Sequence, residues 1–522
     1  MRRPGGRSPL SCENMKITLS QYPTRQVNIG HVLGVALLLR IFLPLAGYFY
    51  TPDVTIFHDP DTDTYIAPAR ELIANQRFFS YGTPEIARTP GYPLSLTPGL
   101  LFHRLEATTI ILQIALSCFT VYMVYLIAQL LFKREQVSVT AATLYAIEPL
   151  SIFYSSQILT ETLFTTLGTV WLYFLLRYLK NGLLRHLLIS GVILAASVYV
   201  RPIGYFLPIL IAAGLGIYAF ANGQHDTLRL VTHSAIFLVM TMGLIIPWQL
   251  RNRAETGYSG FSSLAPLNMY FYLANSVLAA QQHVPFFEMR HRLGYNDVRQ
   301  DQVGYLNEDT YLARHPEQKS WAIAQRLSYI DHEAVHILLM NPWTYARMHV
   351  LGIVHTIVDP GATNFLIFFR LYRLGGGFFG GLQDRGMVKT VSEAIVKNPL
   401  IFWSNALLLP MELAYLSFAC IALFSRRVRL DPAVLTAFLI LSYYIAIPGA
   451  SQAQARFREP AMPMISVLAG YGLWLGSQRW RGTRESIILT HMARSRRNWF
   501  LVRIPSGPRC PERQQVSLSE RL

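Results

Sequence analysis

Apolar runs of about 18–25 residues recur along most of this chain, and that length suits helices that cross roughly 30 Å of hydrocarbon. Only 15% of the 522 residues are charged, against about 25% in ordinary soluble domains. Because backbone polar groups in a bilayer must be satisfied within the segment, such runs predict helices. The sequence therefore predicts an all-α polytopic membrane protein with about ten spans. The spans are expected near residues 28–50, 107–132, 136–154, 160–179, 185–200, 203–221, 229–248, 400–424, 431–448 and 461–478.

The net charge of +16 comes from basic residues that stand in short clusters between apolar runs and in both tails. Cytoplasmic loops carry such clusters under the positive-inside rule, and anionic membrane lipids are their natural partner. We therefore expect no nucleic-acid partner, and we expect a multi-pass cell (inner) membrane protein with both termini in the cytoplasm. The residues that define this side are Arg2, Arg3, Arg7, Lys133, Arg134, Lys180, Arg185, Arg229, Arg426, Arg427, Arg429, Arg479, Arg481, Arg484, Arg496 and Arg497.

This topology divides the chain into five parts. A cytoplasmic tail (1–27) precedes a transmembrane core (28–248), whose first outer loop (51–106) carries an acidic motif. A large extracytoplasmic segment with interfacial helices (249–399) is followed by C-terminal transmembrane helices (400–478) and a basic, disordered cytoplasmic tail (479–522). Within the large segment, Asp359-Pro360-Gly361 interrupts an apolar run at 345–370, which predicts a helix lying at or dipping into the outer interface. Gly375-Gly376-Gly377 predicts a loop over 371–399.

Three acidic residues, Asp59, Asp61 and Asp63, directly follow the first span. Helix capping would explain one of them. The predicted topology also places several arginine motifs and one further acidic motif at the same membrane face. A single arginine near a helix end usually reaches for head groups. Carboxylates suit base chemistry, and guanidinium groups suit the binding of a phosphate. Together they indicate a lipid phosphate that carries a transferable group as the substrate.

The ordered set of motifs resembles the GT-C superfamily of glycosyltransferases, specifically family 39 with the protein O-mannosyltransferases and aminoarabinose transferases. The resemblance spans about residues 30–478. Its motifs are Asp61-x-x-x-Tyr65 with the following Ala69/Leu72 helix, RTPGYPL at 88–94, TETLF at 160–164, RPIG at 201–204, PWQLRN at 247–252, NPWTY at 341–345 and RFREPAMP at 456–463.

The resemblance implies a GT-C fold with extracytoplasmic loop helices and an inverting transfer from a polyprenyl-phosphate sugar to an acceptor hydroxyl. It implies Asp61 as the catalytic base. The mannosyltransferase type usually has an adjacent Asp-Glu pair, whereas Thr62 follows Asp61 here, so Asp59 or Asp63 can share the role. Glu161 is a further candidate, for orienting the acceptor or holding a cation. The candidates for binding the donor phosphate are Arg88, Arg201, Arg251 and Arg458.

No metal or other cofactor is required if arginines bind the phosphate, although a divalent cation remains an alternative. The acceptor is a protein, a lipid or a glycan, and the residues do not distinguish these. A transporter or flippase of a lipid-linked saccharide is the main alternative function, because ten spans and the intramembrane Arg40 also suit it.

A second pattern, HEAVH at 332–336, matches the His-Glu-x-x-His zinc motif of metalloproteases. No recognisable extended motif places a third ligand, so an interfacial helix before the Asn341-Pro342 turn is the simpler interpretation.

Overall fold

The computed structural model describes residues 28–221, 227–295, 306, 309–372, 392, 395–396, 399–450 and 453–499. The predicted N-terminal tail (1–27), the Gly375–Gly377 loop and the residues after 499 lie outside the described residues. Within the described part, the chain is helical apart from one small antiparallel hairpin, β1 (Phe79–Ser80) and β2 (Thr83–Pro84). This confirms the predicted all-α fold.

The protein is a multi-pass membrane protein. Among the described residues, five helical segments are long and apolar enough to span a bilayer, or six if a bent helix pair counts as one. These five are α1 (Ile29–Tyr50), α4 (Leu105–Phe132), Pro202–Phe220 with η2 (Pro202–Gly204) and α9 (Leu207–Ala221), α10 (Thr227–Thr256), and α20 (Pro399–Leu423). Packed with them are α7 (Glu161–Asn181), α8 (Leu184–Val200), α21 (Arg426–Leu430), α22 (Pro432–Ala446) and α23 (Met462–Trp499).

The span predicted at 136–154 is broken into α5 (Glu135–Ala146) and α6 (Pro149–Tyr154). Pro149 occupies the first position of α6, where the missing N–H of proline costs nothing. The Glu148 carboxylate caps the new helix by accepting hydrogen bonds from the amides of Leu150 and Ser151. A carboxylate followed by proline thus starts a second helix where hydropathy alone predicted one.

The predicted interruption at Asp359-Pro360-Gly361 separates α16 (Pro342–Val358) from α17 (Ala362–Phe368), and the two helices meet at 65°. Gly361 has φ +70°, a left-handed conformation that favours glycine. Together the pair is apolar enough for a broken span or a re-entrant loop. We refer to α16 and α17 as the bent pair.

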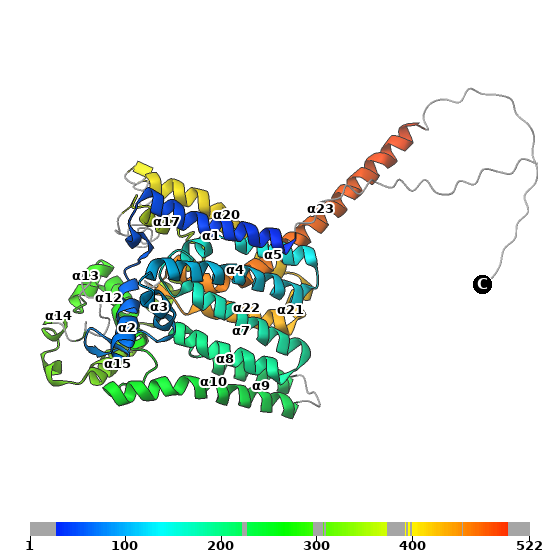
Figure 1. Cartoon of the computed structure of the whole chain (residues 1–522). Coiled ribbons are helices and arrows are strands. Elements are labelled where there is room, and N and C mark those ends of the chain that lie inside the picture. The colour runs from blue at the N-terminus through cyan, green and yellow to red at the C-terminus, as the bar shows by residue number, and fades with distance from the viewer. Residues whose placement is uncertain are drawn as a thin grey trace, which may run out of the picture.

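The bundle has two ends, and a layer of shorter helices lies at only one of them (Figure 1). One end carries basic groups: Lys180 forms an ion pair with Asp431 at 2.6 Å, and Arg229 donates to the Gly182 carbonyl at 3.1 Å. At the other end lie η1 (Val54–Phe57), α2 (Thr62–Asn75), α3 (Gly91–Leu101) and a layer of shorter helices. That layer contains α11 (Leu264–Asn268), a π-helical turn (Met269–Ala274), α12 (Asn275–Gln282), α13 (Phe286–Arg292), α14 (Asp309–Leu312), η5 (Pro316–Ser320) and α15 (Ile323–Met340).

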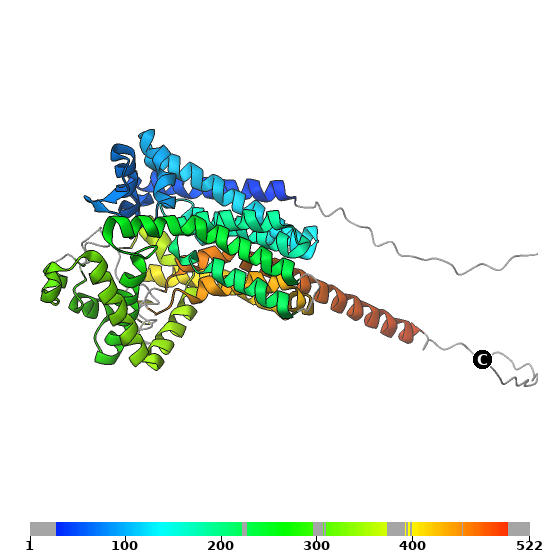
Figure 2. The ribbon, with the colours of Figure 1, turned by 90° about the horizontal axis from the view of Figure 1, so that it is seen from below.

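The helix α23 continues to Trp499, beyond the span end expected at 478 (Figure 2). The sequence contains no proline between Pro463 and Pro505, and Gly482 alone does not end a helix. The expectation of a disordered tail from residue 479 is therefore wrong for the part of the tail up to Trp499.

Arg40 lies inside the bundle with none of its side chain exposed. Its guanidinium donates to the Ser117 hydroxyl at 2.7 Å, the Ala146 carbonyl at 2.8 Å and the Ser151 hydroxyl at 3.0 Å. These bonds join α1, α4, α5 and α6. Arg40 is therefore committed to packing, as a buried charge in a membrane core requires.

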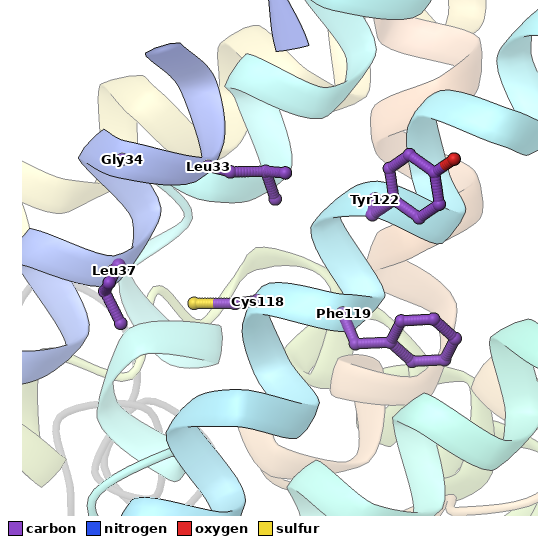
Figure 3. A pocket seen from close by; sticks show the side chains of 6 residues that line it. All are labelled: Leu33, Gly34, Leu37, Cys118, Phe119 and Tyr122. Atoms are coloured by element: carbon purple, nitrogen blue, oxygen red, sulfur yellow. The ribbon is translucent and has the colours of Figure 1, made fainter. Parts of the chain in front are cut away.

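An apolar groove of about 420 Å³ opens on the flank of the bundle between α1 and α4 (Figure 3). It is lined by Leu33, Gly34, Leu37, Cys118, Phe119 and Tyr122.

Candidate active site

Five charged side chains from separate helix ends converge at the end of the bundle that carries α2 and α3. Asp61 immediately precedes α2, Arg88 lies just before α3, Glu161 opens α7, Arg201 follows α8, and Arg456 lies in η7 (Ala455–Ala461). A spanning helix leaves its terminal backbone groups and its polar flanks at the membrane boundary. The bundle therefore brings these residues together because each ends or begins a helix.

Asp61 lies between two guanidinium groups. Its Oδ1 accepts from Arg88 Nη2 at 2.9 Å and its Oδ2 accepts from Arg456 Nη2 at 3.0 Å. Although Asp61 occupies the N-cap position of α2, its side chain makes no capping hydrogen bond. The position of this carboxylate is therefore explained by ion pairing and not by helix capping.

Arg88 holds this arrangement from one side. Its Nε donates to the Thr64 hydroxyl and its Nη1 to the Tyr65 hydroxyl, both at 2.9 Å, while the guanidinium lies 4.4 Å from the Tyr65 ring centroid. Tyr65 follows Asp61 by one helical turn, so both face the same arginine. This contact gives the Asp-x-x-x-Tyr spacing a physical reason.

Glu161 forms the second acidic element and is completely buried. Its Oε1 accepts from Arg201 Nη1 at 3.1 Å and lies 3.5 Å from Arg456 Nε. That Nε is buried and makes no hydrogen bond, so the ion pair with Glu161 is its only contact of this kind among the described residues. The contact chain contains three guanidinium groups and two carboxylates, a net charge of +1, which suits an anionic ligand.

The two acidic residues at the start of the motif experience opposite electrostatic effects. Burial alone would raise the pKa of Asp61, but the Arg88 and Arg456 guanidinium groups outweigh it and hold that pKa below its usual range. Burial raises the pKa of Asp59, whose Oδ1 accepts from the Asp61 amide at 3.1 Å. Asp61 is therefore a firmly ionised carboxylate, and it is a weak base while both guanidinium groups remain in place.

Asp61, Glu161, Arg88 and Arg201 were predicted from the sequence, and the structure brings all four together. Asp63, also predicted, lies exposed in the first turn of α2, apart from this cluster.

Arg251 and Arg458 lie elsewhere. Arg251 donates to the carbonyls of Phe78 and Glu85, both at 2.6 Å, and so fastens the first outer loop to α10. Arg458 is completely buried and pairs with Glu412 at 2.9 Å. Neither guanidinium reaches Asp61, because each is committed to these other groups.

The sequence interpretation selected Arg458 and passed over Arg456 in the same motif. A 3₁₀-helix has three residues per turn, so positions two apart point in different directions. The motif itself was the only signal for Arg456, since the direction of each side chain depends on how η7 packs.

The HEAVH segment forms part of α15, where His332 and His336 are exposed. The ring of His332 lies 2.7 Å from the Ser328 carbonyl through Nδ1. Within the described ranges, no group of three or more His, Cys, Asp or Glu side chains is arranged to hold a metal ion.

Comparison with known proteins gives one family match. Residues 96–248 match the family of dolichyl-phosphate-mannose-protein mannosyltransferases. The matched stretch contains Glu161 and Arg201 and runs from α3 to within α10. It confirms, over this part of the chain, the glycosyltransferase resemblance that the motifs indicated. No curated protein matches the chain.

Several solved structures are also similar. The archaeal oligosaccharyltransferase AglB from Archaeoglobus fulgidus, in complex with an inhibitory peptide and a dolichol-phosphate, shares 13% identity with a TM-score of 0.47, over 88% of this chain and 51% of its own. A structure of the Archaeoglobus fulgidus enzyme with Zn and sulfate shares 14% identity with a TM-score of 0.37, over 84% and 53%. ArnT from Cupriavidus metallidurans bound to undecaprenyl phosphate shares 12% identity with a TM-score of 0.34, over 85% and 77%. The chain thus spans about half the length of the archaeal enzyme.

The lowered pKa of Asp61 predicts an acid-sensitive stability. Because the folded pKa lies below the ordinary value of 3.8, the ionised carboxylate stabilises the fold fully above that value. This stabilisation is lost as pH falls below it toward the folded pKa. We expect the melting temperature of the purified protein in detergent to fall as the pH is lowered below 3.8, and to fall less in Asp61→Asn. Asp63→Asn is the matched control and should follow wild type, and an Asp61→Asn profile identical to wild type would contradict the ion-pair assignment.

Proposed function

We propose that this protein is a glycosyltransferase that moves a sugar from a polyprenyl-phosphate donor to an acceptor hydroxyl, with inversion at the anomeric carbon. The observation that carries the proposal is the Asp61 carboxylate held between Arg88 and Arg456, beside the Glu161–Arg201 pair, at one end of a membrane bundle. The family match over residues 96–248 supports the reaction class.

The proposed orientation places this site on the extracytoplasmic face of the cell membrane. Lys180 and Arg229 lie at the opposite end of the bundle from Asp61, together with the loops after α4 and α20. Basic loops face the cytoplasm under the positive-inside rule. Both termini then lie in the cytoplasm, since α1 begins and α23 continues from that end.

The donor phosphate is proposed to bind Arg456 and Arg201. The Nε of Arg456 is buried and makes no hydrogen bond, and Arg201 donates from Nη1 to Glu161, which leaves its other guanidinium edge for a phosphate. Arg88 has all three of its nitrogens engaged, so its role is to hold Asp61 in place. The net charge of +1 in this contact chain favours the phosphate of the donor and of the polyprenyl-phosphate product.

Donor binding also explains how Asp61 becomes a base. A phosphate that attracts Arg456 takes one of the two guanidinium groups that depress the pKa of Asp61, and so makes the carboxylate more basic. Asp61 then removes the proton from the acceptor hydroxyl as its oxygen bonds to the anomeric carbon. The bond between that carbon and the phosphate oxygen breaks on the opposite side, and polyprenyl phosphate leaves.

The acceptor is proposed to meet the site from the outer helical layer. The Ser262 hydroxyl donates to the Ala87 carbonyl at 2.6 Å and the Ser263 amide donates to the Ile86 carbonyl at 2.9 Å, next to Arg88. The segment after α10 is thus fastened directly to the loop that carries the site. A protein, lipid or glycan hydroxyl would each suit Asp61 chemically.

Asp61→Asn should lower transfer by about 10²- to 10⁴-fold, because the amide cannot accept the acceptor proton. The measurement is transfer from radiolabelled polyprenyl-phosphate hexoses and pentoses to membrane extract by purified protein in lipid. Asp63→Asn is the matched control and should retain transfer. Absence of donor turnover by wild type, with faster movement of the same lipid across liposomes, would instead establish a flippase.

Arg456→Ala should raise the KM for the donor and weaken inhibition by added polyprenyl phosphate, because both ligands lose one guanidinium contact. Arg456→Lys should lose less, since the charge stays while the planar fork is lost. Arg253→Ala, on an exposed position of α10, is the control and should leave the donor KM unchanged. A donor KM that is unaffected in Arg456→Ala would remove Arg456 from the phosphate site.

Activity should persist in a strong chelator, because guanidinium groups supply the positive charge that a metal would otherwise contribute. The measurement compares initial transfer rates with and without excess chelator. Complete loss of activity that one divalent ion restores would show instead that the carboxylates hold a cation during the reaction.

A further inference from the structure

The short helix η7 connects the proposed active site with a second buried cluster. Arg456, near its start, reaches Asp61 and Glu161. Arg458, two residues later, points elsewhere and donates from Nη1 to the carbonyls of Thr356, Ile357 and Asp359, each at 2.9 Å.

The carbonyls bound by Arg458 are those at the break in the bent pair. Since α16 ends at Val358, its last carbonyls have no amide partner one turn later. Such groups must be satisfied by protein where water is excluded. The Arg458 guanidinium supplies donors at the negative end of the helix dipole, and Glu412 of α20 balances its charge at 2.9 Å.

The bent pair also contacts the other half of the site. Arg370, just after α17, pairs with Asp53 and donates to the Thr55 hydroxyl at 2.7 Å. Phe368 of α17 packs against Phe57 with ring centroids 6.2 Å apart. These contacts hold η1, which leads within a few residues to Asp61.

We propose that Arg458 is a positioning residue that fixes η7 on the break of the bent pair and thereby holds Arg456 against Asp61. The bent pair then aligns both partners of the catalytic ion pair, Asp61 through η1 and Arg456 through η7. This gives residues 342–370 a role in the reaction. The effect on kcat that we expect below rests on the proposed function.

Arg458→Met is the first test. Methionine is unbranched and of similar length, but it is apolar and so removes all four hydrogen bonds. We expect a kcat about 10- to 100-fold lower, as for other displacements of a catalytic group by about 1 Å. In an Arg456→Ala background, the same substitution should change kcat by less than about threefold, because the residue that it positions is already absent. Arg458→Lys should recover part of the lost rate.

Arg326→Met is the matched control. Arg326 is also buried and donates to three backbone carbonyls, those of Gln318, Leu306 and Lys319, but in the outer layer. The kcat reductions caused by Arg326→Met and Arg456→Ala should multiply in the double variant, as expected for independent changes. If the kcat reductions caused by Arg458→Met and Arg456→Ala also multiply in the double variant, Arg458 only stabilises the fold, and the proposal is overturned.

A second measurement is independent of activity. In a cysteine-free background, Asp61→Cys and Arg456→Cys would be linked with a short bis-maleimide, and the linked fraction compared with and without Arg458→Met. We expect Arg458→Met to lower the linked fraction and Arg326→Met to leave it unchanged. Unchanged linking in Arg458→Met overturns the positioning role even if transfer is demonstrated. Reduced linking, together with no sugar transfer by the wild-type protein, supports the positioning role and contradicts the proposed function alone.

Discussion

The Asp61 carboxylate and its two guanidinium partners are the interaction on which the arrangement of this protein depends. Arg88 lies 27 residues away in the sequence and Arg456 lies 395 residues away. A partly buried ion pair of this kind is lost when any partner is displaced. The first outer loop and the last part of the bundle must therefore pack together before the site exists. In our proposal the bent pair keeps those two distant segments in register through its contacts with η1 and η7.

The bilayer decides where such chemistry can occur. Charged side chains inside the bundle need partners, and Arg40 and Arg458 illustrate this with hydrogen bonds to carbonyls and hydroxyls, although the Nε of Arg458 makes none. At the ends of the helices, where the substrate is proposed to arrive, Arg456 pairs with the carboxylates of Asp61 and Glu161, for which a phosphate can compete.

Hydropathy predicted most of the helices, because the requirement for an apolar span is local in sequence. The predicted run 28–50 corresponds to α1 and 107–132 to α4. The break at Glu148 was not predicted, since it depends on one carboxylate folding back to cap the next helix. In the site, Asp61 could be selected because the family that the motifs resemble has its base one turn before a tyrosine, as Asp61 stands before Tyr65. Arg458 was preferred to Arg456 because a motif records which residues are present and not which way each side chain points, and that direction is set by Glu412 and the bent pair.

An ion-paired aspartate is a poor base and a guanidinium paired with it is a weakened phosphate ligand, so under the proposed function the site without donor would be inactive on both counts. A donor phosphate changes both at once, because it competes with Asp61 for Arg456. Accepting the donor and activating the base are then one electrostatic event. Before the donor binds, the pKa of Asp61 is lowered and the carboxylate would deprotonate water poorly. After the donor binds, the same carboxylate would be a stronger base for the acceptor hydroxyl. The ion pair thus favours binding of the donor before the acceptor, without any moving lid. The hydrogen bonds from Arg88 to Thr64 and Tyr65 stabilise the pair in the absence of donor.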